Sequence, residues 1–371
     1  MQLQKLDTTK KEDVRQFARF PFTLYRSNPY WVPPMQGELE TVMNRNAHPF
    51  YMHSDADFFV IREGKDVLGR IAVLKNENFC RYHQRETAFF YYFESIDDFN
   101  VSELLLIGAE DWARQHGATE LMGPKGFLRS NGLGLLVEGF NLLPAMGIPY
   151  NPPYYQELIE RAGFEKETDH LSGFMNHQLT PRLHQAADRV IARDQFKVMK
   201  FKNRKDMLEI ISSVEAIHKK AFENNPGFYP STPQEFDMLA RNIIAIADPK
   251  MIKVILHNDE IAGFIIAYRN INSAIQKVHG RIFPFGWISL LSAKRNSKIA
   301  DLNGVGLLPE FQGLGGNVLL YSEVEKTLVN TGMKLAEIVQ VDERNFKSKS
   351  DMEFMQVTWN KRHRTYKKNL S

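Results

Sequence analysis

A candidate ligand-binding stretch begins at Leu302, where an apolar run leads into a glycine-rich turn and then a helical pattern. Gly313, Gly315 and Gly316 stand between the run and the first helical residues. A strand that turns directly into a helix points free backbone N–H groups and the positive helix end at one place, which favours a phosphate. Glycines let the phosphate approach the backbone. The stretch therefore predicts a pyrophosphate site, with a purely structural turn as the alternative.

Other reactive groups in the sequence lack the partners that their chemistry needs. His48, His53 and His363 have no metal-ligand spacing with acidic or cysteine partners, so we expect no metal. Cys80 has no candidate base partner, which indicates a core or surface thiol. No Gly-x-Ser-x-Gly turn occurs, which argues against that type of serine hydrolase.

Composition indicates a globular protein of two domains. The chain has 371 residues, of which 43% are apolar and 25% charged, so it can bury more than one core. One cysteine, no apolar leader and no membrane-length run predict a cytoplasmic protein without a membrane partner. The formal net charge of +3 is small, which makes a nucleic acid an unlikely partner. Basic clusters at 200–205, 294–298 and 361–368 fit solvated faces.

An internal repeat organises the elements that must position the glycine-rich turn. Val60 to Asn76 aligns without gaps on Val254 to Asn270, a shift of 194 residues, and each block reads as two apolar strands around a polar turn. Asn151 and Asn345 are separated by the same 194 residues. Blocks that recur in the same order predict two copies of one fold.

Each half is predicted to run helix, helix, strand hairpin, strand, helix, strand, helix, strand, which is a mixed α/β sheet. In the second half this places helices at 206–222, 232–247, 313–330 and 345–355, and strands at 251–271 (a hairpin), 299–307, 334–341 and 358–367. We expect an N-terminal domain at 1–178, a linker at 179–198 and a C-terminal domain at 199–371.

The glycine-rich turn also carries a resemblance to a known family. Its residues Leu307-x-Pro309-x-x-Gln312-x-x-Gly315-Gly316-Asn317 resemble the V-x-P-x-x-[QR]-x-x-G-x-[GA] element of the GNAT superfamily, the acyl-CoA-dependent N-acyltransferases. With Asn345 opening a later helix and Tyr366 in a closing strand, the resemblance spans Phe201 to Lys367. The first half resembles a degenerate copy, so the resemblance implies two tandem GNAT-like domains.

The resemblance implies an acyl-CoA cosubstrate, with acetyl-CoA as the first expectation. The residues implicated in binding it are Val305, Leu307 and Leu308 for the pantetheine, Gln312, Gly313, Leu314, Gly315, Gly316 and Asn317 for the pyrophosphate, and Asn345.

Three positions depart from the family pattern. Asn317 stands where the family has a small residue, Met352 where it often has a tyrosine as general acid, and Val357-Thr358 where it has Gly-Phe. In the first half the corresponding turn holds Asp97 and Asp98, which oppose an anion, so we expect CoA only in the second half.

N-acylation needs a neutral, unprotonated amine, a polarised thioester carbonyl and a proton for the departing thiolate. Backbone N–H groups around Leu307 and Leu308 are the candidates for polarising the carbonyl. Glu310, or Asp301 or Glu337 through a water, is the candidate base, and Tyr366 or Tyr321 the candidate acid. Each of these carboxylates and tyrosines also fits a surface or packing role.

The sequence therefore predicts an acyl-CoA-dependent N-acyltransferase that acts on an unidentified small-molecule or peptide amine. Two alternatives remain open. One is a non-catalytic module that binds an acyl-CoA or a protein, and the other is a transferase that uses aminoacyl-tRNA and would need salt-dependent RNA binding.

Overall fold

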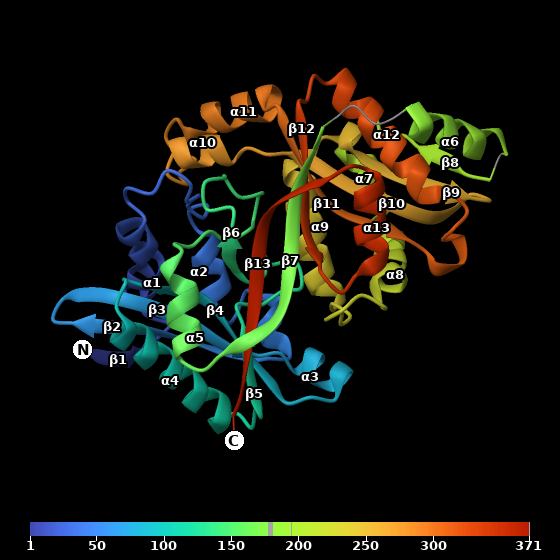
Figure 1. Cartoon of the computed structure of the whole chain (residues 1–371). Coiled ribbons are helices and arrows are strands. Elements are labelled where there is room, and N and C mark those ends of the chain that lie inside the picture. The colour runs from blue at the N-terminus through green and yellow to red at the C-terminus, as the bar shows by residue number, and fades with distance from the viewer. Residues whose placement is uncertain (177–180, 194, 371) are drawn as a thin grey trace. The chain divides into compact units, whose positions relative to one another are not determined.

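The computed structural model describes residues 1–176, 181–193 and 195–370, and the chain divides into two compact units (Figure 1). Unit 1 comprises Met1–Leu171, Asn272–Leu291 and Lys361–Ser371, and unit 2 comprises Ser172–Ile271 and Ser292–Asn360. Of the predicted linker 179–198, residues 179, 180 and 194 lie outside the described residues. The rest of it contains helix α6 (Pro181–Ala192), which belongs to unit 2.

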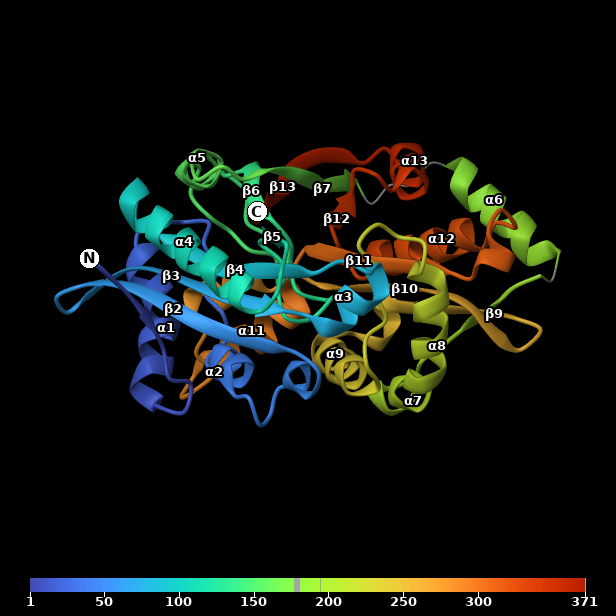
Figure 2. The same ribbon diagram turned by 90° about the horizontal axis from the view of Figure 1, so that it is seen from below.

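Unit 1 is a mixed sheet with helices on both faces (Figure 2). Its strands lie in the order β1-β2-β3-β4-β5-β13, and β6 also pairs with β13. The strands are β1 (Gln2–Lys5), β2 (Asp55–Glu63), β3 (Asp66–Lys75), β4 (Thr87–Ser95), β5 (Glu120–Gly123), β6 (Leu135–Glu138) and part of β13 (Thr358–Asn369). The helices are α1 (Lys11–Leu24), α2 (Glu38–Met43), α3 (Glu77–His83), α4 (Phe99–Gln115), α5 (Tyr154–Arg161) and α10 (Asn272–Lys277).

Unit 2 has the same layered plan. Its strands lie in the order β12-β11-β10-β9-β8, and β11 and β12 form a parallel pair. The strands are β8 (Lys197–Met199), β9 (Ile252–His257), β10 (Glu260–Arg269), β11 (Ile299–Leu307) and β12 (Leu335–Asp342). Helices α7 (Arg204–Glu209), α8 (Ile211–Phe222) and α9 (Pro233–Ile246) lie on one face of this sheet. Helices α6 and α12 (Gly316–Asn330) lie on the other face, and α13 (Phe346–Phe354) follows β12.

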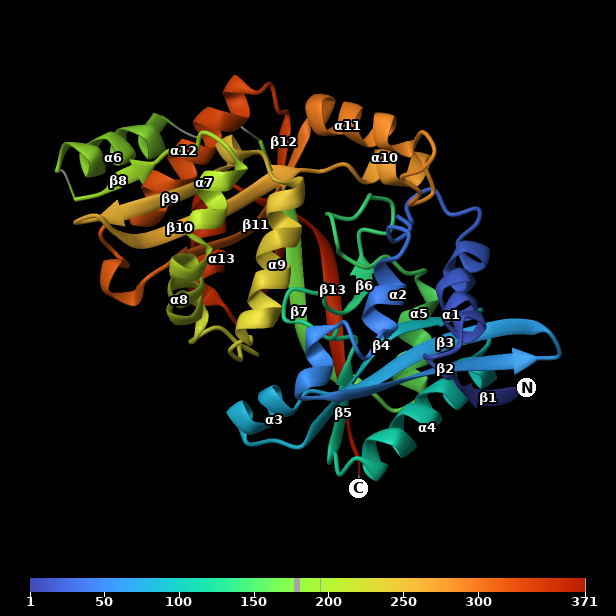
Figure 3. The ribbon, with the colours of Figure 1, turned by 180° about the vertical axis from the view of Figure 1, so that it is seen from behind.

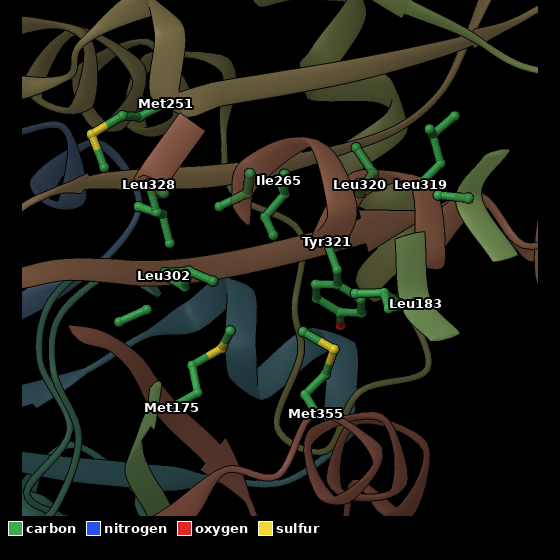
Figure 4. Packing of buried hydrophobic residues seen from close by; sticks show 14 of the residues in the cluster. Met175, Leu183, Met251, Ile265, Leu302, Leu319, Leu320, Tyr321, Leu328 and Met355 are labelled. Carbon is green, nitrogen blue, oxygen red and sulfur yellow. The ribbon is translucent and has the colours of Figure 1, made fainter. Parts of the chain in front are cut away.

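The core of unit 2 lies between its sheet and α12. Leu319, Leu320 and Leu328 of α12 pack with Ile265 of β10 and Leu302 of β11, all buried in one cluster (Figure 4). Deleting a fully buried leucine side chain typically costs about 2–5 kcal/mol. This cluster therefore fixes where α12 begins relative to the end of β11.

The internal repeat is confirmed by strand register. In unit 1, Ile61 pairs with Gly69 across the β2–β3 hairpin. In unit 2, Ile255 pairs with Gly263 across the β9–β10 hairpin. Both positions shift by 194 residues, so the two hairpins share a register as well as a sequence pattern. The described elements follow the predicted order in each half, with β1, α3 and β6 as additions in the first and β8, α10 and the helix at Gly286–Asn296 as additions in the second.

Residues 272–296 were not predicted to hold helices, yet they form α10 and the helix α11 (Gly286–Asn296). Helix α10 buries Ala274 and Ile275, whereas no residue of α11 is buried. The apolar residues of α11 therefore do not pack into a core, which is how helices of globular proteins are usually recognised from sequence. Among the described residues, no helix combines the length and apolar character needed to cross a bilayer.

Two long strands contribute to both units. β7 (Glu165–Asn176) and β13 lie side by side, and the division between the units falls after Leu171 in the first and before Lys361 in the second (Figures 1 and 3). The end of β13 is antiparallel to β5, with Tyr366 opposite Gly123. The closing strand of the second repeat therefore completes the sheet of unit 1. The predicted domain boundaries at 178 and 199 describe where the sequence repeats begin and end, and they stay a prediction. The compact units are different, because each is made of separate stretches of the sequence.

Candidate functional site

Strands β11 and β12 of unit 2 part before β11 ends. Their parallel register runs from Ile299 opposite Leu335 to Leu302 opposite Ile338. Beyond Leu302, β11 stays paired with β10 as far as Leu307 opposite Gly263. Within the part of the chain that the structure describes, residues 303–307 thus have a strand in register on one side only. The other side presents a backbone edge that an extended chain can pair with.

Alternation along β11 decides which backbone groups face this edge. The N–H of Leu308 donates to the carbonyl of Ala262 in β10, at 3.0 Å. Successive residues direct their backbone groups to opposite sides of a strand, so the N–H groups of Val305 and Leu307 point away from β10. The Leu307 carbonyl accepts from Gln312 Nε2 at 3.2 Å, consistent with that direction. Leu308, predicted to offer its amide to a ligand, uses that amide within the sheet.

A bulge lies where the two strands part. The register between β10 and β11 passes from Ile265 opposite Val305 to Ala267 opposite Leu302, so β11 contains one extra residue there. Gly304 has φ of 116°, a conformation that favours glycine. Bulges re-aim the backbone next to them. This one turns β11 out of line with β12 directly ahead of Val305.

The glycine-rich turn follows β11 and opens α12, as predicted. Gly313 and Gly315 have φ of 80° and 89°, and Gly315 is the N-cap of the helix. A Cβ at Gly315 would lie 2.5 Å from Val190 of α6, so this glycine is required for packing as well as for its backbone conformation. A Cβ at Gly313 would meet nothing within 4 Å, so the turn is open at that residue.

The first backbone N–H groups of α12 have no partner inside the helix, which is the general property of helix starts. Gly316 begins the helix and packs tightly, since a Cβ there would lie 2.9 Å from Leu307. Leu314, just before the N-cap, has an exposed side chain. The end of β11, the turn and the helix start are therefore held together as one rigid corner.

Side chains from α13 border this corner. Asn317 donates to Asp351 at 3.1 Å, so its amide is directed at α13 and leaves the helix start clear. Lys347 donates to Gln312 Oε1 at 3.2 Å, which brings a cation next to the turn. Asn345 caps α13 by accepting from the Ser348 N–H at 3.1 Å. A helix start flanked by a lysine suits an anion.

A row of buried polar side chains crosses the sheet next to the parting strands. Tyr268 of β10 is opposite Asp301 of β11, and Asp301 is opposite Glu337 of β12. Residues opposite each other share a face of the sheet. Asp301 and Glu337 are 0% and 1% exposed. Burial raises the pKa of Tyr268, and the two carboxylates raise that pKa further.

This row lies on the sheet face away from α12. The neighbouring residues Ala300, Leu302 and Ala336 belong to the core beneath α12, and side chains alternate along a strand. Asn270 donates to both Asp301 oxygens, at 3.0 and 3.2 Å, and Asn303 donates to the Tyr268 hydroxyl at 2.8 Å. Buried carboxylates are costly unless they are compensated by such donors or by a cation.

The other predicted catalytic residues lie in different places. Glu310 is exposed on the short 3₁₀ turn Pro309–Phe311, directly after the end of β11. Tyr321 is buried in α12, where burial and the charge of Asp351 raise its pKa. Met352 is buried in the core of unit 2.

Tyr366 belongs to unit 1, where its side chain is fully buried and its hydroxyl donates to Glu160 Oε1 at 3.1 Å. Burial and the Glu160 carboxylate raise the pKa of Tyr366. A proton donor must reach the departing sulfur, so these contacts favour a packing role for this tyrosine. Its predicted catalytic role remains a prediction.

In unit 1 the corresponding backbone position is occupied by tyrosines. Ser95 is the counterpart of Leu307, since Ser95 is opposite Gly69 as Leu307 is opposite Gly263. The Ser95 N–H donates to the Tyr155 hydroxyl at 2.9 Å, and the Ser95 carbonyl accepts from the Tyr154 hydroxyl at 2.8 Å. These two tyrosines bond both backbone groups of Ser95, whereas in unit 2 the Leu307 carbonyl accepts from the Gln312 side chain.

We did not predict this role of Tyr154 and Tyr155 from the sequence. A signal was available, because the repeat shift of 194 residues aligns them with Ser348 and Lys349, neither of which is aromatic. The first half thus has large hydroxyl-bearing side chains where the second half has none.

Asp98 caps α4 in unit 1. Its side chain accepts from the Asn100 N–H at 2.8 Å, so a carboxylate occupies the helix start where unit 2 has a glycine. The aspartate thus lies at the helix start, and the exclusion of an anion from this turn stays a prediction.

The repeated hairpins, the parted strands and the glycine-led helix define a tandem GNAT fold. A solved tandem GNAT protein from the clavulanic acid biosynthesis pathway matches over 100% of this chain and 98% of its own, with a TM-score of 0.57 and 13% sequence identity. No protein-family model matches the chain.

Two curated proteins are similar to this chain in sequence. Protein YghO of Escherichia coli is 27% identical over 375 residues, covering 97% of this chain and 94% of the relative. The bacterial ceramide synthase of Caulobacter vibrioides is 26% identical over 305 residues, covering 81% of this chain and 79% of the relative.

In the described residues, no three His, Cys, Asp or Glu side chains gather as ligands for a metal ion.

Proposed function

We infer that the protein is an acyl-CoA-dependent N-acyltransferase whose unit 2 binds the acyl-CoA. The observation that carries this inference is the parting of β11 and β12 after Leu302, directly ahead of the glycine-led start of α12. The open backbone edge of β11 is therefore followed directly by the start of α12, so one extended ligand could contact both. A pantetheine arm needs the first and a pyrophosphate needs the second.

The cosubstrate residues follow from that path. The outward N–H groups of Val305 and Leu307 pair with the pantetheine, and one of them polarises the thioester carbonyl. The N–H groups at the start of α12, with Gly313 open beside them, hold the pyrophosphate. Lys347 supplies a cation next to Gln312. Acetyl-CoA and longer acyl-CoAs both fit this backbone-based recognition.

The amine acceptor is held by the buried carboxylates. Asp301 and Glu337 lie one residue before the last paired positions of β11 and β12, close to the point where the thioester would lie. An amine at neutral pH is mostly an ammonium ion, and a pair of buried carboxylates attracts it and accepts its proton before attack. This pair fits the role of base better than Glu310, whose side chain is exposed.

The name of one curated relative suggests a class of amines to include among the acceptors tested. The relative named bacterial ceramide synthase is similar over 81% of this chain. We therefore include long-chain amines and long-chain acyl-CoAs among the substrates, together with small-molecule and peptide amines and acetyl-CoA.

Binding is tested with one glycine substitution and a matched control. Gly313→Asp adds a carboxylate at the open turn, and we expect it to weaken CoA binding in calorimetry by roughly tenfold or more, because like charges repel in a partly desolvated site. Gly117→Asp is the control, since Gly117 has φ of 72° and nothing within 4 Å of a Cβ. Both changes carry the same backbone strain of about 1–2 kcal/mol. Equal CoA affinity in the two variants would contradict the proposed site.

A second candidate function is acyl-CoA binding without turnover. The observation that favours it is the burial of Met352, which puts no acidic side chain at the position where the family often has a tyrosine. A CoA thiolate can nevertheless leave near neutral pH, because a thiol of this kind has a pKa of about 8.5. Release of free CoA thiol with any acceptor of the panel supports the enzyme, whereas tight CoA binding without release supports the binding module.

A further inference from the structure

A cluster of exposed apolar side chains lies on the segment between α10 and the middle of α11. We name it the aromatic patch, and its members are Ile282, Phe283, Phe285, Trp287, Ile288 and Leu291. Phe283 and Phe285 are 80% and 73% exposed. Exposed aromatic residues scattered singly are normal, but six large apolar side chains within ten residues need an explanation.

Helix α11 directs its apolar side chains outward. Trp287 and Leu291 are four residues apart and Ile288 and Leu291 three apart, so they lie on one face of the helix. All three are exposed, while Leu290 and Ala293 on the opposite face are partly covered. A surface helix of a globular protein normally has the reverse arrangement, with its polar face in water.

The segment that supports the patch is held in place by hydrogen bonds to the rest of unit 1, two of which come from side chains. Asn272 Nδ2 donates to the Pro144 carbonyl at 2.8 Å, and Gln276 Nε2 donates to the Trp31 carbonyl at 2.8 Å. The carbonyl of Gly280 accepts from the Gln36 N–H at 2.9 Å. The chain that enters the patch is therefore anchored on one side, which leaves the patch itself available to a partner.

The charged residues of the sequence segment that carries the patch are of one sign. The forty residues from Ile261 to Ala300 contain six Lys and Arg residues and no Asp or Glu. Arg281 precedes the patch, and Arg295 lies one helical turn beyond Leu291 on the exposed face of α11; both are exposed. An apolar centre with basic residues at its ends matches the interface of an anionic bilayer, where aromatic rings enter the headgroup layer and cations meet lipid phosphates.

We propose that the aromatic patch docks the protein on the surface of an anionic lipid membrane, with Phe283, Phe285 and Trp287 inserted at the level of the headgroups. A bilayer fits better than a protein partner, because an uninterrupted lack of acidic residues gives attraction to any anionic surface and no pattern of opposite charges for one specific partner. We predicted no membrane partner from the sequence, because the sequence has no apolar run long enough to cross a bilayer. Interfacial docking requires no such run.

This proposal does not rest on the proposed acyltransferase activity, because docking is measured without substrate. The full chain is sedimented with vesicles of phosphatidylcholine alone and with vesicles that also contain phosphatidylglycerol. We expect binding to the anionic vesicles, weakened by salt. We expect F283S/F285S to lower that binding by roughly tenfold or more, since most of the inserted area is lost.

The matched control is M52S/F354S, which removes side chains that are 68% and 59% exposed elsewhere on the chain. It should bind vesicles like the parent protein. A second variant, R281E/R295E, should lose binding to anionic vesicles while keeping the parent melting temperature. The proposal is overturned if the parent protein does not bind anionic vesicles, or if F283S/F285S binds them as well as M52S/F354S. If the parent protein does not bind, a change from oligomer to monomer in light scattering of F283S/F285S would show that the patch instead joins two copies of this chain.

Discussion

At the scale of single residues, Tyr366 illustrates how the chemistry of a side chain depends on the strand that bears it. Tyrosine in a closing strand is a reasonable proton donor on sequence grounds. In the structure the ring lies in the core of unit 1 together with Phe90 and Tyr155, and its hydroxyl is bonded to Glu160. A buried hydroxyl with its own acceptor contributes mainly to stability.

We therefore expect Tyr366→Phe to lower the free energy of unfolding by about 1 kcal/mol, since one partly buried hydrogen bond is lost. CoA affinity should not change, and kcat should stay within a few-fold of the parent value once an acceptor is known. Chemical denaturation and steady-state kinetics measure the two effects. Tyr82→Phe, at an exposed ring, is the control for stability. A fall in kcat of about 10²–10⁴ with unchanged stability would instead identify Tyr366 as the general acid.

At the scale of elements, the strands and helices that frame the site could be predicted because their patterns are local. β11 occupies the predicted range Ile299–Leu307, and α12 begins at Gly316, three residues after the predicted start. The intervening residues form the turn, whose open and packed glycines the sequence could not distinguish. That distinction depends on Val190 of α6, which is distant in sequence.

The point where β11 and β12 part could not be predicted for a related reason, and the repeat showed that Tyr154 and Tyr155 lack aromatic counterparts but not which strand they contact. Where two strands separate is decided by register on both sides of β11, including the bulge before Val305. The hydrophobic periodicity of a sequence predicts which residues form a strand, but it does not predict at which residue the strand stops pairing with its neighbour. The same holds for Tyr154 and Tyr155, whose hydroxyls reach a strand about sixty residues earlier in the chain.

The start of α4 differs from the start of α12, because a carboxylate caps it in place of a glycine. Asp98→Ala removes its N-cap, which we expect to lower the free energy of unfolding by about 1 kcal/mol. CoA affinity should stay at the parent value, because Tyr154 and Tyr155 still occupy the backbone of Ser95. Calorimetry and thermal unfolding on the same sample measure both quantities. Loss of CoA binding in this variant would mean that unit 1 takes part in binding the cosubstrate.

At the scale of the whole molecule, we expect the folding of the first repeat to depend on β13, the closing strand of the second repeat. β13 crosses from unit 2 into unit 1, where Arg362 and Arg364 bond the fully buried Asp169 of β7. Burial alone would raise the pKa of Asp169, but its bonds to Arg364, Lys166 and Arg362 outweigh burial and hold that pKa below its usual value. Removing both arginines would leave the buried carboxylate with only Lys166 of these three partners, which is destabilising because a buried charge needs compensation. The compact units therefore depend on residues about 200 positions apart in sequence.

This arrangement predicts how fragments of the chain behave. A fragment of residues 1–178, the predicted N-terminal domain, lacks the residues of β13 that pair with β5 and β6. It also lacks Arg362 and Arg364, so Asp169 would be a buried charge without them. We expect this fragment to be expanded and to lose cooperative thermal unfolding. Joining residues 361–371 to its end through a flexible linker should restore a cooperative transition, because the strand can then return to β5. Circular dichroism during heating and the radius from light scattering compare the two fragments at equal concentration. A sharp transition in the 1–178 fragment alone would show that the first repeat folds without the closing strand, and the discontinuous units would then have no bearing on how the protein folds.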